Sequence, residues 1–281
     1  MKRLQVLYAT EGSVVTKVLR DQQECVLKEY RVEMDKLIYM LNEVCISTRM
    51  NHDNVIRTLS YSVDGQRLRI LQEYADGGDL VTFKSGFPNE HVPEDITRGL
   101  ISQLLCAVDY IHDLGIIHRD IKPENILISE EVVKLTDFGL SIDTHITDDR
   151  EYAGTTEFMA PEMIRMLNYG QEIDMWAVGC VTYELIYGNS PFYGETEDIT
   201  IFNILNASVS FPRPVTSKCL TFMLKTLCKE PLIRLTAKEA LDSEFITTKK
   251  TLRRSHSIEV LNDHRAVPGR GNSIPRLKQS F

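Results

Sequence analysis

The sequence HRDIKPEN, at residues 118–125, is the densest polar stretch of the chain and decides the fold. An apolar run, Ile-Leu-Ile, follows it at 126–128. Twelve residues after Asn125 comes DFG, at 137–139, which is preceded by the strand-like stretch VKLT. Because two short strands joined by a turn lie side by side, we expect the polar residues of the two motifs to lie close together.

The side chains of these motifs suit a site for magnesium and polyphosphate. Mg²⁺ keeps several waters and takes only one or two carboxylate ligands, so Asn125 and Asp137 are sufficient as ligands. Asp120 is then free to accept a proton from a hydroxyl group, and Lys122 to neutralise charge on a moving phosphoryl group. Together these roles predict a phosphoryl-transfer site.

The segments before the motifs predict a small β-rich lobe with one main helix. Residues 4–30 and 55–75 alternate apolar and polar positions and contain many β-branched residues, with a turn at Asp64-Gly65. Between them, residues 33–49 carry apolar side chains at helical spacing. The sequence DGGD at 76–79 then breaks the pattern.

The segments that follow predict a larger, mainly helical lobe. Residues 96–111 carry one apolar stripe at helical spacing, which is typical of a helix that packs against a core. Residues 172–187 are apolar nearly all round, which predicts a buried helix. The predicted fold class is therefore α+β with two lobes.

Composition indicates an ordinary globular protein with an intracellular location. The chain has 281 residues, of which 43% are apolar and 26% are charged. Its six cysteines are scattered and form no CxxC pair, which argues against a zinc site or a disulfide framework. No stretch approaches the roughly 20 apolar residues of a membrane span. The apolar run after the first three residues is too short for a signal peptide.

Charge is distributed unevenly along the chain. The formal net charge is −8, but residues 247–281 carry +6 and the preceding residues −14. An acidic body argues against specific nucleic-acid binding. The last segment is basic and poor in apolar residues, and we therefore predict that residues 247–281 form a disordered tail.

Three ordered motifs give the chain a resemblance to a known family. HRD at 118–120, DFG at 137–139 and APE at 160–162 follow the order and spacing of eukaryotic-type protein kinases. In that family an arginine placed like Arg234 pairs with the glutamate placed like Glu162. The resemblance is very specific, because it needs three motifs in register.

The resemblance implies a bilobal protein kinase domain at residues 4–246. Its N-lobe would span about 4–72, its hinge about 73–78 and its C-lobe about 79–246. The substrates implied are ATP, bound with Mg²⁺ or Mn²⁺, and a protein.

The resemblance also implies roles for individual residues. Asp120 would be the catalytic base, assisted by Lys122, while Asn125 and Asp137 would hold the metal. Lys28 would bind phosphates of ATP and pair with a glutamate on the helix of the N-lobe. The other nucleotide-binding residues implied are Gly12, Val18, Val26, Glu43, Glu73, Ala75, Asp79 and Leu127, with Gln72 as the gatekeeper.

The phosphate loop lies within YATEGSVVTKVL, residues 8–19, and has one glycine where the family has three. If Val18 is the valine that faces adenine, the glycine positions fall on Glu11, Ser13 and Thr16. If Gly12 is instead the middle glycine, Lys17 must face adenine. We expect the Val18 register because it buries no charge. Side chains in place of glycines hold the backbone further from phosphate, so we also expect weakened ATP binding.

The form of the catalytic loop resembles serine/threonine kinases. Lys122 after RDI is typical of that class, and Thr155 is expected to hydrogen-bond Asp120 and Lys122. Leu140, directly after DFG, favours serine as the acceptor. The acidic residues that resemble those reading arginines in substrates are Asp79, Glu124 and Glu184, which favours basic substrates.

Regulation is predicted from two departures from the family pattern. Glu151 stands where many kinases carry an activating phosphate, so its carboxylate would pair with Arg119; the rival is phosphorylation of Thr144 or Thr147. Ser47 stands where the family has an apolar residue. We expect it to hold the helix weakly, so that an activating or scaffolding protein partner is needed.

The alternative function of the protein is that of a pseudokinase, which acts as a scaffold or allosteric partner.

Overall fold

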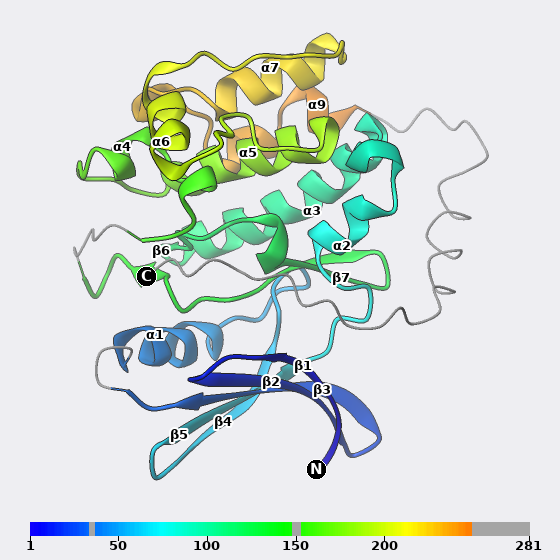
Figure 1. Cartoon of the computed structure of the whole chain (residues 1–281), viewed down its shortest axis with the longest axis vertical. Helices are drawn as coiled ribbons and strands as arrows, with labels where there is room; N and C mark the ends of the chain where they lie inside the picture. Colours follow the sequence, from blue (N-terminus) through cyan, green and yellow to red (C-terminus); the bar gives the residue numbers. More distant parts are fainter. Residues whose placement is uncertain (34–36, 148–152, 249–281) are drawn as a thin grey trace. The chain divides into compact units, whose positions relative to one another are not determined.

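Five strands form an antiparallel sheet in the first part of the chain, drawn from blue to cyan in Figure 1. They are β1 (Lys2–Ala9), β2 (Ser13–Arg20), β3 (Gln23–Arg31), β4 (Thr58–Asp64) and β5 (Arg67–Glu73), in the order β1-β2-β3-β5-β4. The structure is a computed structural model, and it describes residues 1–33, 37–147 and 153–248. The predicted turn between β4 and β5 is confirmed, and Gly65 there has a φ of +59°, which suits glycine.

Helix α1 (Leu37–Ser47) is the main helix of this lobe, as predicted. Its buried residues Met40 and Val44 pack against Leu68 and Ile70 of β5. Apolar residues at i and i+4 lie on one helix face, so the spacing seen in the sequence is what holds α1 against the sheet.

The second lobe is mainly helical and contains short strands near the first lobe (Figure 1). Its longer helices are α3 (Glu94–Asp113), α5 (Glu172–Tyr187), α6 (Glu197–Asn206) and α7 (Ser217–Thr226). Its shorter helices are α2 (Leu80–Ser85), α4 (Pro161–Ile164), α8 (Ala237–Leu241) and α9 (Glu244–Thr247). Its strands are β6 (Ile116–Ile117), β7 (Ile126–Ser129), β8 (Val132–Leu135) and β9 (Ile142–Asp143).

Helix α5 forms the centre of the core in this lobe. All its residues from Ile173 to Tyr187 are buried, which confirms the buried helix predicted from its apolar composition. Trp176 stacks on Phe192 with ring centroids 5.3 Å apart. The helix ends at Gly188, whose φ of +86° is the left-handed conformation that terminates helices.

The two strand pairs of this lobe place the polar motifs. HRDIKPEN lies between β6 and β7, and DFG lies between β8 and β9. Strand β7 pairs with β8, and β6 pairs with β9, so both motifs end at the same place in the fold. This juxtaposition confirms the bilobal α+β fold and the expected proximity of the two motifs.

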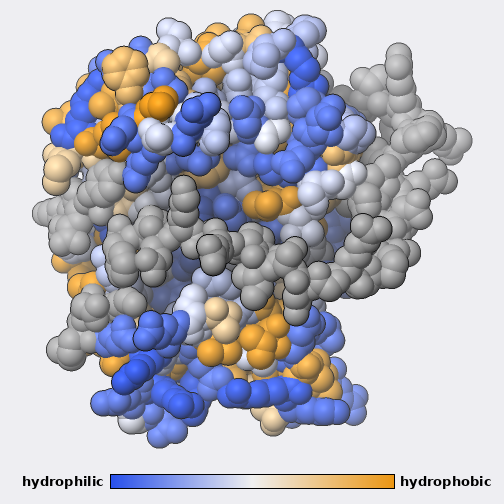
Figure 2. Space-filling model, in the orientation of Figure 1, coloured by the Kyte–Doolittle hydropathy of each residue, from blue (hydrophilic) through white to orange (hydrophobic). Residues whose placement is uncertain are grey.

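Figure 2 shows a mixed surface, with apolar patches over the lower lobe and, at the upper left, over α4 and α6. The exposed apolar residues of that region include Met166, Leu167 and Phe202. Among the described residues, no helix has the length and apolar composition to cross a membrane. Of the predicted tail, residues 249–281 lie outside the described part of the chain.

Candidate active site

The loop before Asp120 is held by one buried carboxylate. Asp174, at the start of α5, accepts the backbone N–H groups of His118 at 2.8 Å and Arg119 at 3.0 Å. Burial would raise the pKa of Asp174, but the hydrogen bond and charge of His112 outweigh burial and lower it. Arg119 has a φ of +69°, a conformation that a non-glycine residue keeps only when its surroundings enforce it. Asp174 therefore fixes the backbone that presents Asp120.

The carboxylate of Asp120 is bound on both oxygens. Oδ1 accepts the hydroxyl of Thr155 at 2.9 Å, and Oδ2 lies 2.8 Å from Nζ of Lys122. Nζ of Lys122 also donates to the Thr155 hydroxyl at 2.6 Å, so both predicted contacts of Thr155 form. Gly154 lies against this group: a Cβ there would be 2.5 Å from the carbonyl oxygen of Arg119. The glycine is therefore needed for the loop of Thr155 to reach Asp120.

Asn125 is oriented with its amide oxygen available to a ligand. Its Nδ2 donates to the backbone oxygen and to Oδ2 of Asp120, both at 2.9 Å. Asp137 lies nearby in the same cavity as Asp120 and has a φ of +69°. In the described ranges, no three His, Cys, Asp or Glu side chains gather to hold a metal alone. An amide oxygen, one carboxylate, water and phosphate together fit Mg²⁺.

Lys28 and Glu43 form an ion pair between β3 and α1. Nζ of Lys28 lies 2.9 Å from Oε1 of Glu43, and Oε2 of Glu43 accepts the backbone N–H of Phe138 at 2.6 Å. Burial would lower the pKa of Lys28, but the carboxylates of Glu43 and Asp137 outweigh burial and raise it. Lys28 is therefore held as a cation beside DFG.

The hinge is fastened by Glu73, whose backbone N–H donates to the carbonyl of Arg57 at 3.0 Å. Oε1 of Glu73 accepts Nζ of Lys134 at 2.8 Å and the backbone N–H of Arg57 at 2.9 Å. Ala75 is buried two residues further on. Gly77 approaches β7 so closely that a Cβ would lie 2.8 Å from the oxygen of Ile128. A structural turn therefore explains Gly77 without a nucleotide contact.

Asp79 and Leu127 lie together at the edge of the hinge and form an isolated β-bridge. The carboxylate of Asp79 accepts the backbone N–H of Thr82 at 2.7 Å and caps α2. Its predicted contact with the nucleotide therefore competes with a helix cap. Gly12 lies in the turn before β2, where a Cβ would meet only Oε1 of Glu33 at 3.7 Å.

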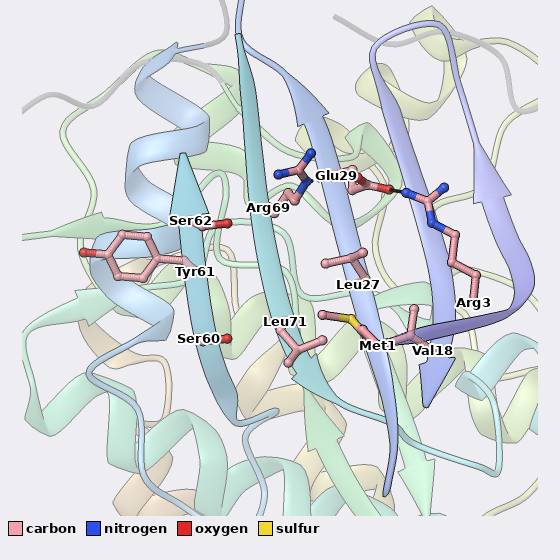
Figure 3. A pocket seen from close by; sticks show the side chains of 10 residues that line it. All are labelled: Met1, Arg3, Val18, Leu27, Glu29, Ser60, Tyr61, Ser62, Arg69 and Leu71. Atoms are coloured by element: carbon pink, nitrogen blue, oxygen red, sulfur yellow. Dashed lines mark hydrogen bonds and ion pairs between the residues drawn. The ribbon is translucent and has the colours of Figure 1, made fainter. Parts of the chain in front are cut away.

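Val18 does not lie where the preferred register placed it. In the pairing of β2 with β3, Val18 is opposite Cys25, whereas Val26 and Lys28 are opposite Lys17 and Val15. Cross-strand partners share one face of a sheet, and neighbours along a strand alternate. Figure 3 shows Val18 beside Leu27 and Leu71. These residues line a cavity of about 320 Å³, and Lys28 is not among the residues that line it. Val18 as an adenine contact is therefore wrong, and the register with Gly12 as the middle glycine is the one observed.

Lys17 occupies the adenine face without burying its charge. Its Nζ lies 4.1 Å from the ring centroid of Tyr74 in the hinge and 2.8 Å from Oε2 of Glu24. The hydrogen bond to Glu24 raises the pKa of Lys17. A long cationic side chain can lay its aliphatic stem along a surface while its ammonium reaches a polar partner, and the contacts of the Lys17 ammonium fit this behaviour. The Val18 register was expected because burying the charge of Lys17 in the other register is costly, and the pairing of Lys17 with Glu24 shows that this charge is compensated.

Ser47 is part of a polar chain that sequence reasoning missed. The Thr58 hydroxyl donates to Oγ of Ser47 at 3.0 Å and accepts Nε2 of Gln72 at 3.2 Å. Ser47 and Gln72 are both buried. These hydrogen bonds link α1 to the last residues of β5. The ion pair between Lys28 and Glu43 is formed in the same structure. A serine in an otherwise apolar helix stripe was the only sequence signal, and it did not identify Thr58.

Asp79, Glu124 and Glu184 were predicted to contact basic side chains of a substrate, but their carboxylates are not equally free to do so. Nζ of Lys84 lies 2.5 Å from Oε1 of Glu184, and both side chains are buried. Asp79 caps α2. Glu124 is exposed, and burial together with the charge of Glu124 raises the pKa of Glu157. Of the three, Glu124 is the one whose carboxylate has no hydrogen bond or ion pair to another residue in the described part of the chain, and it lies near an acidic neighbour.

The activation segment is described only in part. Glu151 lies outside the described residues, so its pairing with Arg119 stays a prediction. The Arg119 guanidinium donates to the carbonyl of Leu140 at 2.5 Å and to the hydroxyl of Tyr169 at 3.0 Å. The Thr144 hydroxyl donates to the carbonyl of Gly115 at 2.8 Å.

The segment that follows is anchored by the predicted pair of Glu162 and Arg234. Nη1 and Nη2 of the arginine lie 2.6 and 3.1 Å from the two carboxylate oxygens. Both side chains are buried, so this two-pronged contact is strong and geometrically defined.

Comparison with known proteins agrees with this architecture. A family profile described as the protein kinase domain matches residues 9–246. An Aurora kinase of Eremothecium gossypii is 34% identical over 210 residues, covering 74% of this chain and 57% of that protein. Aurora kinase C of Mus musculus is 32% identical over 238 residues, covering 84% of this chain and 83% of that protein. A RAC serine/threonine-protein kinase of Drosophila melanogaster is 35% identical over 213 residues.

The last of these matches covers 74% of this chain and 34% of the Drosophila protein, so the chain spans from a third to more than four fifths of these relatives. The matched residues contain both polar motifs and most of the sheet. Sequence motifs, lobe architecture and relatives thus agree, and the chain belongs to the protein kinase family.

Proposed function

We propose that this chain is a serine/threonine protein kinase that transfers the γ-phosphoryl group of ATP to a protein hydroxyl. The observation that carries the proposal is the group formed by Asp120, Lys122 and Thr155, which is complete and preorganised. The ion pair of Lys28 with Glu43, directly beside DFG, supports it. Lys28, Glu43, Asp120 and Asp137 line one cavity, and Lys122 and Asn125 both contact Asp120, which supports the proposal.

In the proposed reaction Asp120 orients the substrate hydroxyl and accepts its proton as the oxygen attacks the γ-phosphorus, while the bond from this phosphorus to the bridging oxygen breaks and ADP leaves. Lys122 neutralises charge on the transferred group, and Lys28 holds the phosphates that remain on the nucleotide. Asn125 and Asp137 would hold Mg²⁺, which supplies charge neutralisation between the phosphates when bound. The backbone of Glu73 and Ala75 would hold adenine, with Val26, Leu127 and the stem of Lys17 above and below it.

The proposal is tested by Asp120→Asn, assayed with radiolabelled ATP and a generic basic protein. We expect kcat to fall by about 10²- to 10⁴-fold, because a general base is removed. The affinity for ATP should stay within about threefold, since Asp120 does not hold the nucleotide. Equal incorporation by both proteins would contradict the proposal.

The alternative is a pseudokinase, and one observation favours it: the glycine-poor loop uses its own backbone groups within the turn. Wild-type protein that binds no ATP and incorporates no phosphate would support this alternative. Detectable ATP binding with turnover that depends on Asp120 would exclude it.

The proposed substrate preference is narrower than the sequence suggested. Leu140 supports serine as the acceptor. Because Asp79 and Glu184 are engaged elsewhere, Glu124 is the residue that we expect to contact a basic side chain of the substrate. A positional peptide library should show enrichment of arginine or lysine that disappears in Glu124→Gln. A library without basic enrichment would remove this preference.

All six cysteines are free, which supports the proposed intracellular location.

An activating or scaffolding protein partner remains part of the proposal. Ile38 and Leu41 on α1 are 63% and 51% exposed, and they lie one turn apart on the same face, where a partner protein could bind. If a partner acts on α1, the activity of protein isolated from its own cells should fall when bound proteins are removed. Equal activity before and after removal would contradict the partner.

Regulation by Glu151 is proposed on its sequence position alone. Replacing Glu151 by alanine should lower activity if its carboxylate substitutes for a phosphate on the activation segment. If activity is unchanged and mass spectrometry of active protein finds phosphate on Thr144 or Thr147, the rival explanation is correct.

A further inference from the structure

A cavity of about 380 Å³ lies between β3, α1 and the two polar motifs. It is lined by the charged residues Lys28, Glu43, Asp120 and Asp137, so it is the phosphate end of the proposed ATP site. The question for this cavity is which groups donate hydrogen bonds to phosphate, because the loop above it lacks glycines.

Two backbone donors of the loop are used inside the loop itself. The N–H of Thr10 donates to the carbonyl of Ser13 at 2.8 Å, and the N–H of Ser13 donates to Oγ1 of Thr10 at 3.1 Å. The two hydroxyls are also 2.8 Å apart. Each backbone N–H is a single donor, so these two are not available to a phosphate oxygen. The loop therefore has a deficit of donors.

Tyr30 supplies a hydroxyl at the place of this deficit. It is the cross-strand partner of Ser13, and it lies two residues after Lys28, on the same face of β3. Its side chain lines the cavity together with Lys28 and Asp137. Among the residues that the structure describes, no hydrogen-bond partner of the Tyr30 hydroxyl is found. Two other tyrosines line the cavity, but Tyr8 and Tyr39 are 47% and 37% exposed.

We propose that the hydroxyl of Tyr30 donates a hydrogen bond to a phosphate oxygen of the bound nucleotide, in place of a backbone N–H of the loop. This inference rests on the proposed function and assigns a nucleotide-positioning residue to it. A phosphate oxygen is an acceptor, and a phenol is a donor that adds no charge to a cavity already holding three carboxylates and one ammonium.

The surroundings keep this hydroxyl protonated. Burial raises the pKa of Tyr30, and although the charge of Lys28 lowers it, the carboxylates of Glu43 and Asp137 raise it further. Tyr30 is thus a donor throughout the neutral range of pH. Its ring packs beside the cluster of Met40, Val44, Leu68 and Ile70, so the ring has a structural role that is separate from the hydroxyl.

The test is the substitution Tyr30→Phe in the full chain, which keeps the ring and removes the hydroxyl. Isothermal titration with Mg²⁺ measures binding of a non-hydrolysable ATP analogue and of adenosine. The dissociation constant for the ATP analogue should rise about tenfold, because a hydrogen bond to a charged group is lost. The constant for adenosine, which has no phosphate, should stay within about twofold.

Tyr61→Phe is the matched control, since Tyr61 lies on β4 and is 56% exposed. It should change neither constant. Equal weakening of both ligands in Tyr30→Phe would show that the residue only packs the lobe, and unchanged binding of the analogue would show no contact; either result overturns the inference. Wild-type protein that binds no ATP analogue overturns the proposed function, and this inference with it.

Discussion

Lys17 shows how one residue can be misplaced when its environment is judged by charge alone. A lysine that faces adenine looks unfavourable in the sequence, because a buried ammonium is costly. In the structure Lys17 lies on the face of β2 that pairs with Val26, and its ammonium reaches Tyr74 and Glu24. The side chain therefore divides into an apolar part and a charged part with different surroundings.

This division predicts different effects for two substitutions of Lys17. Lys17→Met keeps most of the stem and should leave the KM for ATP within about threefold. Lys17→Ala removes about 1–2 kcal/mol of apolar contact, so that KM should rise about tenfold. Steady-state kinetics at varied ATP measures both. Equal KM values for the two variants would mean that the stem does not cover the nucleotide.

At the scale of elements, the seating of α1 combines apolar packing with a polar chain. Met40 and Val44 pack on β5, while Ser47 joins β4 and β5 through Thr58. Lys28 and Glu43 are paired in this arrangement, so a serine in the apolar stripe does not by itself separate α1 from the sheet. What the serine changes is the kind of contact that holds the helix.

Thr58→Val should destabilise the protein by breaking the hydrogen bonds that join Ser47, Thr58 and Gln72. The substitution conserves shape but leaves the buried hydroxyl of Ser47 and the amide of Gln72 without their partner, which costs about 1–3 kcal/mol of the free energy of unfolding. Adding Ser47→Ala should cost less than the sum of the two single variants, because the groups belong to one network. Chemical denaturation of the four proteins measures the coupling. If the losses in the free energy of unfolding were strictly additive, the hydrogen bonds of Ser47, Thr58 and Gln72 would not act as one network.

At the scale of the whole molecule, the lobes are also joined by contacts that do not involve the HRD and DFG residues themselves. Glu73 of the hinge binds Lys134 of β8, and His52 stacks on Tyr110 of α3 with centroids 4.8 Å apart. Nδ1 of His52 accepts the backbone N–H of Asn54 at 3.1 Å, which requires a neutral ring. One contact between the two lobes thus involves a histidine in its neutral form.

This histidine predicts a dependence of stability on pH. Burial lowers the pKa of His52 below its unfolded value of about 6.5. The unfolded chain then binds more protons, so the contribution of His52 is complete above about pH 6.5 and declines as pH falls through the lower folded pKa. Urea denaturation at pH 7.5 and 5.5 should show a larger loss for the wild type than for His52→Gln. The same loss in both proteins would exclude His52 as the cause.

Sequence by itself determined the chemistry, the fold class and the main helices of this protein. The proximity of Asp120, Lys122, Asn125 and Asp137 could be predicted because the two motifs lie at short, regular spacing along two loops, and their roles in phosphoryl transfer are a proposal. Helices α1, α3 and α5 could be found because apolar periodicity is local information.

Tertiary structure decided which face of β2 covers the nucleotide, which carboxylates are already paired, and what holds Ser47. Each of these depends on a partner distant in sequence: β3 for the register, Lys84 for Glu184, and Thr58 for Ser47. A shift of one residue in strand pairing moves every side chain to the other face, and no local pattern around Val18 could choose between the two registers. Long-range pairing is therefore the physical reason why the motifs were legible in the sequence and the roof of the ATP site was not.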